Sequence, residues 1–173
     1  MSVRGERSEP GAGWWARLVP PSELLRLRLC AYPPYVGAGI VVTHIAPDVS
    51  AVEVELRARP WNRNYVGTHF GGSLYSMADP FFMLIVLRGL GPGWIVWDKS
   101  AAIRFRKPGR GTVRARFHVP PERLEAIRAR FEPGVRSVDE RFTVEILDAE
   151  GDVVAEVEKV VYVRRKSAES QPP

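Results

Sequence analysis

The 173-residue chain is poor in the residues that form covalent cross-links and metal sites, with one cysteine and three histidines. A single cysteine excludes a disulfide within the chain and any cysteine-rich zinc site. We expect Cys30 to be a small core residue, with a reactive thiol as the alternative. His44 and His118 fall on predicted strands, where we expect surface or hydrogen-bonded side chains. We therefore predict no bound metal.

Long hydrophobic runs are also lacking. The longest, Phe81–Leu87, is closed by Arg88 and is far shorter than the roughly 20 residues that span a bilayer. The N-terminal letters MSVRGERSEPGAGWW contain no apolar stretch of the kind found in secretory signals, so we expect a cytoplasmic protein without a membrane partner. Neither a GxSxG nucleophile motif nor a glycine-rich phosphate loop occurs.

The charged residues form no run of five or six of one sign, although the net charge is +5. Arginines alternate with apolar residues, which is typical of the solvated face of a sheet rather than of a nucleic-acid-binding patch. The positive excess would also suit a small ligand that carries phosphates. We therefore expect no nucleic-acid partner, and binding to nucleic acid remains an alternative that depends on charge alone. The hydrophobic content of 45% and the length fit one globular domain.

The two ends differ in composition from the centre. Residues 1–20 are rich in glycine, proline and charge, and residues 165–173 are polar and end in two prolines. Both are predicted to be flexible tails around a single domain at 21–164. At the start of that domain, Ser22 is predicted to cap a short helix over 23–30, which a following proline pair would end.

Alternation of apolar and polar side chains predicts most of the remaining elements. In residues 51–59, four apolar side chains alternate with charged ones, which indicates an antiparallel sheet with one solvated face. In the last predicted strand, Lys159 breaks the apolar alternation, which predicts a bulge or a strand end that is buried on both faces. This last predicted strand is at 152–163, and the other predicted strands are at 40–45, 103–106, 113–119 and 141–148.

Turn residues and one further helix connect these strands. The stretches 108–111 and 149–152 contain glycine in a polar context and are predicted to form hairpin turns. Residues 121–131 have helical spacing between two proline boundaries. We expect Asp98 and Lys99 to pair with neighbouring side chains across the sheet.

One long apolar segment is predicted to be a central helix. Residues 73–90 would form a helix of about 27 Å that is hydrophobic nearly all round and must therefore be surrounded. Its single carboxylate, Asp79, has two interpretations. It caps a helix in which Pro80 is the first residue, or it lies inside a helix that begins near Gly71 and is kinked by Pro80.

The second interpretation suggests chemistry. Gly71 and Gly72 would leave backbone N–H groups bare at a helix start, where they could polarise a carbonyl oxygen as an oxyanion hole does. Asp79 could then act as a general base or as a nucleophile. Within one straight helix the two features are too far apart to hold one carbonyl. We therefore expect an oligomer that places Asp79 of one subunit against Gly71 of another.

Two stretches resemble a known family. NRNYVGTHFGGSLYSMADPFF and VWDKSAAIRFRKPGRGTVRARF look like the DUF4442 branch of the hotdog thioesterase superfamily, and the similarity extends over residues 22–164. The resemblance implies an α+β protein in which an antiparallel sheet of five to six strands wraps around a long central helix. It also implies an acyl-CoA thioesterase that assembles as a homodimer or homotetramer and needs no cofactor beyond the coenzyme A of its substrate.

The resemblance also implies roles for individual residues. In related thioesterases a carboxylate eight residues after the polarising glycine is the base or nucleophile, which corresponds to Asp79 and Gly71. An amide seven residues before that glycine helps to hold substrate or water, which corresponds to Asn64. The usual motif is His-Gly-Gly, but here Phe70 takes the histidine position and His69 precedes it. The remaining candidates for substrate binding are Gly72, His69, Phe70, Arg106, Lys107 and Arg110.

Several of these candidates have a purely structural alternative. The basic residues at 106–110 would meet the phosphates of coenzyme A or would form a solvated turn. An acyl tunnel or the ordinary core would contain Trp61, Phe70, Phe81, Phe82 and Met83. The alternative to a thioesterase is a non-catalytic hotdog module that binds acyl-CoA or fatty acyl groups. That alternative is suggested by Phe70 and Pro80, which depart from the pattern of the active enzymes.

Overall fold

The structure is a computed structural model that describes residues 20–166. The two predicted tails, 1–20 and 165–173, fall almost wholly outside the described residues. Arg165, which was expected to lie in the second tail, is the last residue of the final strand.

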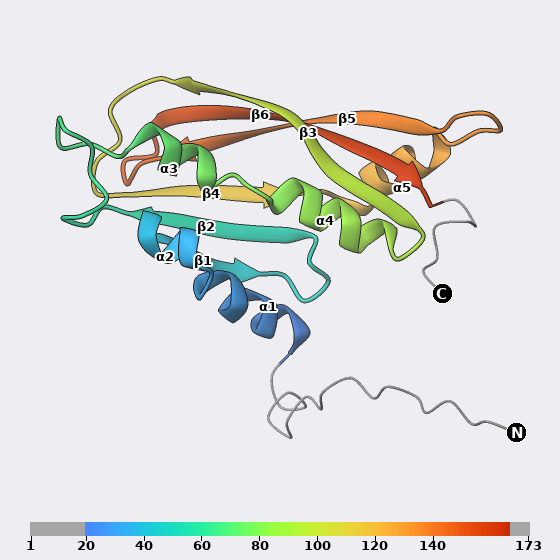
Figure 1. The fold of residues 1–173 in the computed structure, drawn as a ribbon, viewed down its shortest axis with the longest axis horizontal. Coiled ribbons are helices and arrows are strands. Elements are labelled where there is room, and N and C mark those ends of the chain that lie inside the picture. Colours follow the sequence, from blue (N-terminus) through green and yellow to red (C-terminus); the bar gives the residue numbers. More distant parts are fainter. Residues whose placement is uncertain (1–19, 167–173) are drawn as a thin grey trace, which may run out of the picture.

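Six antiparallel strands form one sheet, which confirms the predicted fold class (Figure 1). Their order across the sheet is β1-β2-β4-β5-β6-β3, so that β1 and β3 are the edge strands. The strands are β1 (Ile40–Ile45), β2 (Ala51–Arg57), β3 (Trp94–Phe105), β4 (Thr112–His118), β5 (Ser137–Leu147) and β6 (Val153–Arg165).

Five helices accompany the sheet in the described part of the chain: α1 (Pro21–Cys30), α2 (Pro33–Ala38), α3 (Gly71–Ser76), α4 (Phe81–Leu90) and α5 (Pro121–Ala129). The prediction that Ser22 caps the first helix is wrong, because α1 begins at a proline and has no side-chain cap. Proline is suited to this position, since the missing N–H would be unpaired there anyway. The proline pair that ends α1 also begins α2, which was not predicted.

Of the two predicted hairpins, one is confirmed and one is wrong. Residues 149–152 join β5 to β6, which pair along their length. Residues 108–111 join β3 to β4, but β3 pairs with β6 and lies at the far edge of the sheet. Local turn residues allow the chain to reverse, but they do not determine which strand becomes the neighbour.

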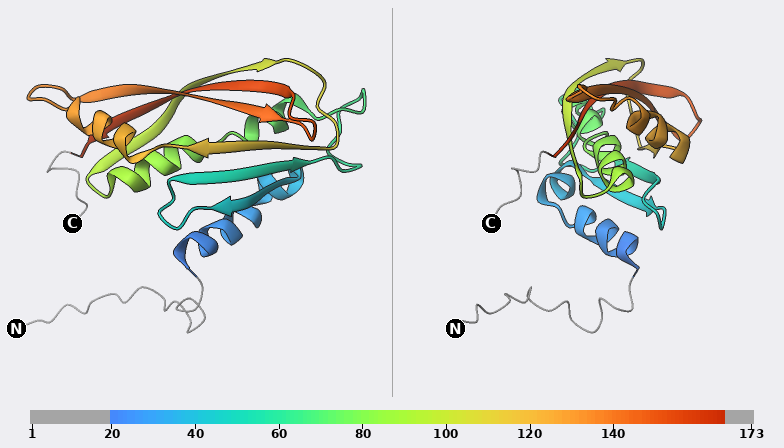
Figure 2. Two further views of the ribbon diagram at one scale, coloured as in Figure 1. Left: turned by 180° about the vertical axis from the view of Figure 1, so that it is seen from behind. Right: turned by 90° about the vertical axis from the view of Figure 1, so that its right-hand side faces the viewer.

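The core lies between α4 and the concave face of the sheet, which curls around the helix (Figure 2). Phe81 and Phe82 are buried against Phe117 of β4, at ring centroid distances of 4.9 and 5.2 Å. Burying one such side chain contributes about 1.5–3 kcal/mol. The segment Gly71–Leu90 is long and apolar enough to cross a membrane, but half of it is buried inside the protein. It is the core helix that the sequence predicts, not a membrane span.

This central helix is interrupted at Asp79. Its start at Gly71 agrees with the second interpretation of Asp79, whereas the first, in which Asp79 caps a helix, is wrong. α3 ends at Ser76 and α4 begins only at Phe81, so the long central helix over Gly71–Leu90 is broken where a kink at Pro80 was predicted. Pro80 occupies the N-cap position of α4, and Asp79 makes no capping hydrogen bond. Because Pro80 has no N–H to donate, it cannot continue the preceding helical ladder. The Asp79–Pro80 peptide is cis, and the carboxylate belongs to the connection between the two helices.

A bulge in β3 shapes the sheet near this connection. The predicted bulge at Lys159 in the last strand is wrong, because β6 pairs there with β5 without a register shift. The shift lies opposite, in β3, where Lys99 is an extra residue between Asp98 and Ser100. As a result, Asp98 and Lys159 both face the core side, and Lys99 reaches Asp139 on the other face at 2.6 Å. This confirms the prediction that Asp98 and Lys99 each pair with a side chain of another strand, Asp98 with Lys159 of β6 and Lys99 with Asp139 of β5.

Candidate functional site

A hollow of about 440 Å³ brings together several of the predicted site residues. Asn64 and His69 reach it from the segment before α3, and Gly71 is the first residue of α3. Arg106 and Lys107 reach it from just after the end of β3. The predicted residues Gly72, Phe70, Arg110 and Asp79 do not line this hollow. The structure therefore assembles part of the candidate site and leaves the carboxylate elsewhere.

Asn64 shapes the loop that leads into α3. Its Oδ1 accepts hydrogen bonds from the backbone N–H of Val66 at 3.1 Å and of Thr68 at 3.0 Å. Its Nδ2 donates to Thr68 Oγ1 at 2.8 Å and to the carbonyl oxygen of His69 at 3.2 Å. Because both ends of the amide bind the loop, Asn64 acts on Gly71 through the backbone that precedes it.

His69 ties the same loop to the turn after β3. The side chain is buried, and its Nε2 lies 3.0 Å from the carbonyl oxygen of Gly111. Burial lowers the pKa of His69, so the imidazole is neutral and donates through Nε2. Of the basic residues nearby, Lys107 already binds Asp148 and Asp152, whereas Arg110 is exposed.

The glycine pair at the start of α3 lies beneath aromatic rings. A Cβ at Gly71 would lie 2.9 Å from Phe105 Cζ, and one at Gly72 would lie 2.4 Å from Phe70 Cε1. α3 has no side-chain cap, so nothing in a side chain satisfies its first N–H groups. The lack of Cβ atoms thus lets the rings of Phe70 and Phe105, both more than half exposed, close over this backbone.

Asp79 belongs to a second group of residues. Lys159 Nζ lies 2.8 Å from Asp79 Oδ1 and 2.8 Å from Asp98 Oδ2. The lysine side chain is 0% exposed, and its ammonium lies 5.5 Å from the centre of the Tyr75 ring. We call Asp79, Asp98 and Lys159 the carboxylate–lysine cluster. The sequence pointed to Asp79 but not to its two partners, although the broken alternation at Lys159 was an available signal.

The three charges of the cluster change one another's protonation. Burial raises the pKa of Asp98, and the hydrogen bond to Asp79 raises it further, to about 6. Burial also opposes ionisation of Asp79, but hydrogen bonds from Asp98 and Lys159 outweigh it and lower the pKa of Asp79. Burial opposes the charge of Lys159 as well, and its bonds to both carboxylates raise its pKa overall. At neutral pH the cluster therefore contains a protonated lysine and an ionised Asp79.

The N-terminal helices form one wall at Asp79. The buried Tyr35 of α2 donates its hydroxyl to the carbonyl oxygen of Asp79. Burial raises the pKa of Tyr35, so the hydroxyl keeps its proton. A hollow of about 380 Å³ opens here, and its lining comprises Leu29, Tyr32, Pro34, Tyr35, Ser76, Asp79 and Pro80. Within one chain, Asp79 and Gly71 thus face different hollows.

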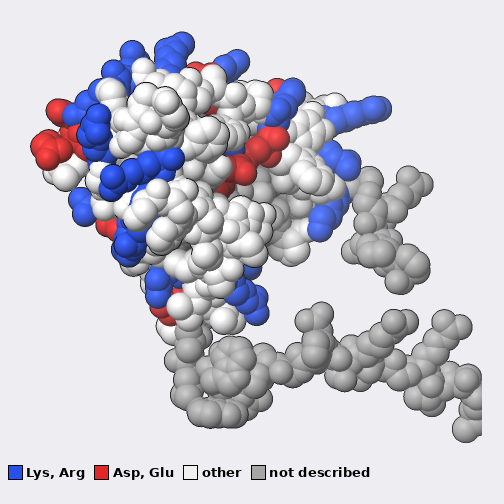
Figure 3. Space-filling view, turned by 60° about the vertical axis from the view of Figure 1, so that its left-hand side comes forward, with Lys and Arg blue, Asp and Glu red and all other residues white. Residues whose placement is uncertain are grey.

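The apolar candidates divide between the core and the surface. Phe81 and Phe82 fill the core, and Met83 packs partly against it. Trp61 and Phe70 are exposed and lie near the start of α3. Viewed toward the α3 end, the surface shows uncharged areas with Lys and Arg side chains around them (Figure 3).

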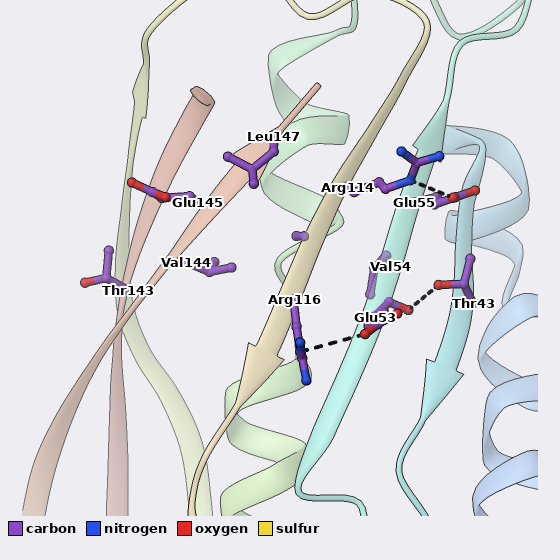
Figure 4. Close-up of a pocket in the computed structure, with 11 residues that line it drawn as sticks. Thr43, Glu53, Val54, Glu55, Arg114, Arg116, Thr143, Val144, Glu145 and Leu147 are labelled. Atoms are coloured by element: carbon purple, nitrogen blue, oxygen red, sulfur yellow. Dashed lines mark hydrogen bonds and ion pairs between the residues drawn. The ribbon is translucent and has the colours of Figure 1, made fainter. Parts of the chain in front are cut away.

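A further hollow, of about 600 Å³, lies away from all predicted site residues (Figure 4). It opens on the convex face where β4 and β5 diverge. Its charged side chains largely pair with each other: Arg114 Nε lies 3.0 Å from Glu55, and Arg116 Nε lies 3.7 Å from Glu53. Because each of these arginines is already paired with a glutamate, we assign no chemistry to this hollow. Among residues 20–166, no group of three His, Cys, Asp or Glu side chains is arranged to hold a metal ion.

Comparison with known families decides the relationship of the chain. The profile described as "Domain of unknown function (DUF4442)" matches residues 22–163. The chain belongs to the DUF4442 family. A search of curated proteins finds no match to this DUF4442 chain.

Solved structures agree with this DUF4442 assignment and show the fold. Protein PA5026 of Pseudomonas aeruginosa is 21% identical with a TM-score of 0.74, covering 84% of this chain and 97% of its own. Thioesterase HI1161 of Haemophilus influenzae is 16% identical with a TM-score of 0.63, covering 87% and 94%. The PaaI protein of the Escherichia coli phenylacetic acid degradation operon is 17% identical with a TM-score of 0.54, covering 83% and 93%. The DUF4442 chain has the hotdog fold.

Proposed function

We propose that this DUF4442 protein is an acyl-CoA thioesterase whose site forms between two subunits. Gly71 would supply the N–H that polarises the thioester carbonyl, Asp79 would act as base or nucleophile, and Asn64 would hold the loop in shape. The thioesterase HI1161, which shares the fold, supports this class of substrate for the present chain. We also propose a cytoplasmic location and a homodimer or a dimer of dimers.

The observation that carries the proposal is that Gly71 and Asp79 both lie beside the edge strand β3. Gly71 lies under Phe105, at the end of β3, and Asp79 joins Asp98, near its middle, through Lys159. β3 has a neighbour on one side only, and its outer residues include Trp97, which is 63% exposed. Such an edge presents unpaired N–H and C=O groups to another strand.

A second copy of β3 would complete the site. Strands that pair antiparallel across a twofold axis place residue i opposite residue j in both directions. If the axis passes between Ala101 and Ala102, Asp98 of each subunit lies opposite Phe105 of the other. Asp79 of one subunit would then approach the hollow at Gly71 of its partner, which a single chain does not achieve. Residues Lys99, Ser100, Ala101 and Ala102 are all exposed, as an unoccupied contact surface would be.

The geometry also suits thioester hydrolysis. The start of α3 has no side-chain cap on its N–H groups, and one such donor to a carbonyl oxygen is worth about 2.7–4 kcal/mol of barrier. Asp79 is ionised and half exposed, so that water or a thioester can reach it. Arg106 lines the hollow and pairs only at 3.7 Å with Glu156, so its guanidinium would be available to the phosphates of coenzyme A.

Subunit mixing provides the test. We expect the parent to release thiol from at least one member of a panel of short, medium, long and aryl acyl-CoAs. Asp79→Asn and Gly71→Val should each lose that activity, since one lacks the base and the other blocks the hollow. Mixed and re-equilibrated, they should regain about a quarter of the parent activity. Half of the dimers would then be mixed, and one of the two sites in each would be intact. Mixing without recovery would show that one subunit supplies both groups.

A non-catalytic module that binds acyl-CoA is the second candidate. It is favoured by the engagement of Asp79 with Lys159, an ion pair of the kind that also stabilises folds without catalysis. This candidate expects saturable binding of acyl-CoA, followed by calorimetry, without release of thiol by the parent. If the parent and Asp79→Asn hydrolysed acyl-CoA equally, Asp79 would be neither the base nor the nucleophile.

A further inference from the structure

The carboxylate–lysine cluster is a costly arrangement. Moving an ammonium such as that of Lys159 away from water costs several kcal/mol unless its partners compensate. Two irregularities of the fold supply those partners. The break between α3 and α4 brings in Asp79, and the bulge at Lys99 turns Asp98 toward the core side. One carboxylate would suffice to neutralise one lysine, so the second requires its own explanation.

We propose that Lys159 and Asp98 are positioning residues: Lys159 keeps Asp79 ionised and fixed, and Asp98 receives the proton that Asp79 removes from water. This inference rests on the proposed thioester hydrolysis, and it adds a place for the proton. Asp79 Oδ1 and Asp98 Oδ2 each lie 2.8 Å from the same Lys159 Nζ, so the two carboxylates are neighbours around one ammonium.

The exposed fractions of the two carboxylates indicate which of them meets water or substrate. The Asp79 side chain is 50% exposed and faces a hollow, whereas that of Asp98 is 21% exposed and stands behind it on β3. Asp98 Oδ1 is buried and has no hydrogen-bond partner within the described residues. Asp79 is therefore the member that meets water or substrate. Asp98 acts only through Asp79.

Every proton in the proposed hydrolysis is accounted for. Water gives one proton to Asp79 as its oxygen forms a bond to the thioester carbonyl carbon. Asp79 and Asp98 share that proton while the tetrahedral intermediate exists. When the carbon–sulfur bond breaks, the sulfur leaves with the electron pair and takes the proton as a thiol. The acid that remains ionises to solvent, and no redox partner is required.

The charges of the cluster support this sequence. With both carboxylates ionised and Lys159 protonated, the cluster has a net charge of −1 and room for one proton. The raised pKa of Asp98, about 6, means that the shared proton is bound below that pH and is absent at neutral pH. The two carboxylates titrate as a pair, so a pH profile reports the pair rather than either residue.

Three variants test the proposal. In each we follow the acid limb, which is the fall of kcat/KM on the acid side of its pH profile. Lys159→Met keeps the length of the side chain but leaves two carboxylates together, so the limb should move up by about 1–3 pH units. Asp98→Asn removes one negative charge and should move the limb down. The double variant restores the charge balance and should return the limb toward the parent. A packing role alone would not move the limb in opposite directions.

Carboxyl carbon NMR tests the same claim without substrate. In ¹³C-aspartate-labelled protein, Lys159→Met should raise the titration midpoint of the pair, and the double variant should reverse that change. Circular dichroism of each variant confirms that it is folded, and the double variant carries the test if Lys159→Met does not fold. Midpoints that stay the same in all variants would overturn the inference. If midpoints shift as expected but no acyl-CoA is cleaved, the proposed hydrolysis fails, while control of Asp79 by Lys159 and Asp98 stands.

Discussion

The hydroxyl of Tyr35 donates a hydrogen bond to the backbone carbonyl oxygen of Asp79, linking the N-terminal helix α2 to the break in the central helix. The bond holds the one stretch of the core helix where the backbone ladder is interrupted. The same bond connects Tyr35, in the wall of the hollow, to Asp79, which is the proposed base or nucleophile.

Replacing Tyr35 should therefore loosen that connection. Tyr35→Phe removes the hydroxyl and leaves the partly buried carbonyl oxygen of Asp79 without this donor, so we expect the free energy of unfolding to fall by about 1–3 kcal/mol. Chemical denaturation measures the change. Tyr32→Phe is the matched control, because Tyr32 is on the same segment but exposed, and it should change stability little. Equal effects of both variants would contradict the importance of the bond to Asp79.

The stability of the protein should depend on pH through Asp98. Its pKa rises from 3.8 to about 6 on folding, so the folded state binds more protons than the unfolded chain between these values. The contribution of Asp98 to stability is then complete below pH 3.8 and is lost as the pH rises through about 6. We expect Asp98→Asn to lack this loss, so relative to the parent it gains stability between pH 4.5 and pH 7.

Urea denaturation at both pH values measures that change. Asp139→Asn is the control, because Asp139 forms an exposed ion pair with Lys99, and such pairs contribute little. A difference between parent and Asp98→Asn that is the same at pH 4.5 and pH 7 would show that folding leaves the ionisation of Asp98 unchanged.

Two helical glycines should respond oppositely to alanine. In α4, a Cβ at Gly89 would lie 2.3 Å from Leu124 Cδ1, so Gly89→Ala should force α5 or its leucine aside at a cost of about 1–3 kcal/mol. In α2, nothing lies within 4 Å of a Cβ at Gly37, and Gly37→Ala should stabilise by about 0.4–1 kcal/mol. Thermal unfolding compares the two. Stabilisation by both would mean that α4 and α5 are not closely packed.

The proposed pairing of β3 makes a prediction about assembly. Ala102→Lys would place two ammonium groups beside the twofold axis, where like charges across paired strands are unfavourable. We expect the parent to sediment as a dimer or larger assembly and Ala102→Lys as a monomer that has lost thioesterase activity. Ala129→Lys, at an exposed position of α5, should behave as the parent does. An active dimer of Ala102→Lys would place the interface elsewhere.

Strands that bury one face were predictable, because a period of two is visible in a single segment. Residues 51–57 alternate whatever pairs with them. Only the end of β3 was predicted, since burial does not alternate along its residues 94–102. Helix α2 was missed because a proline pair marks the end of one helix and the start of another equally well. The hairpin at 108–111 was wrong because its neighbours in the sheet are chosen by distant strands.

The candidate site was predictable only where its residues are close in sequence. Gly71 and Asp79 share one motif, and their spacing could be recognised. Lys159 lies 80 residues from Asp79, and only the fold brings them together. Its departure from the apolar pattern of β6 was visible, but a local bulge explained it equally well. A charged residue on the buried face of a strand deserves a search for carboxylates elsewhere in the chain.

The divergence of β4 and β5 has a mechanical consequence. Only two residue pairs, Arg114 with Leu147 and Ala115 with Ile146, join these strands, whereas β5 and β6 pair along their whole length. The sheet is thus two three-stranded panels, β1-β2-β4 and β5-β6-β3, that meet at a narrow seam over α4. Parting along that seam breaks fewer backbone hydrogen bonds than parting anywhere else in the sheet. The wall around the central helix is therefore weakest between β4 and β5, three strands in from the edge on which the proposed site lies.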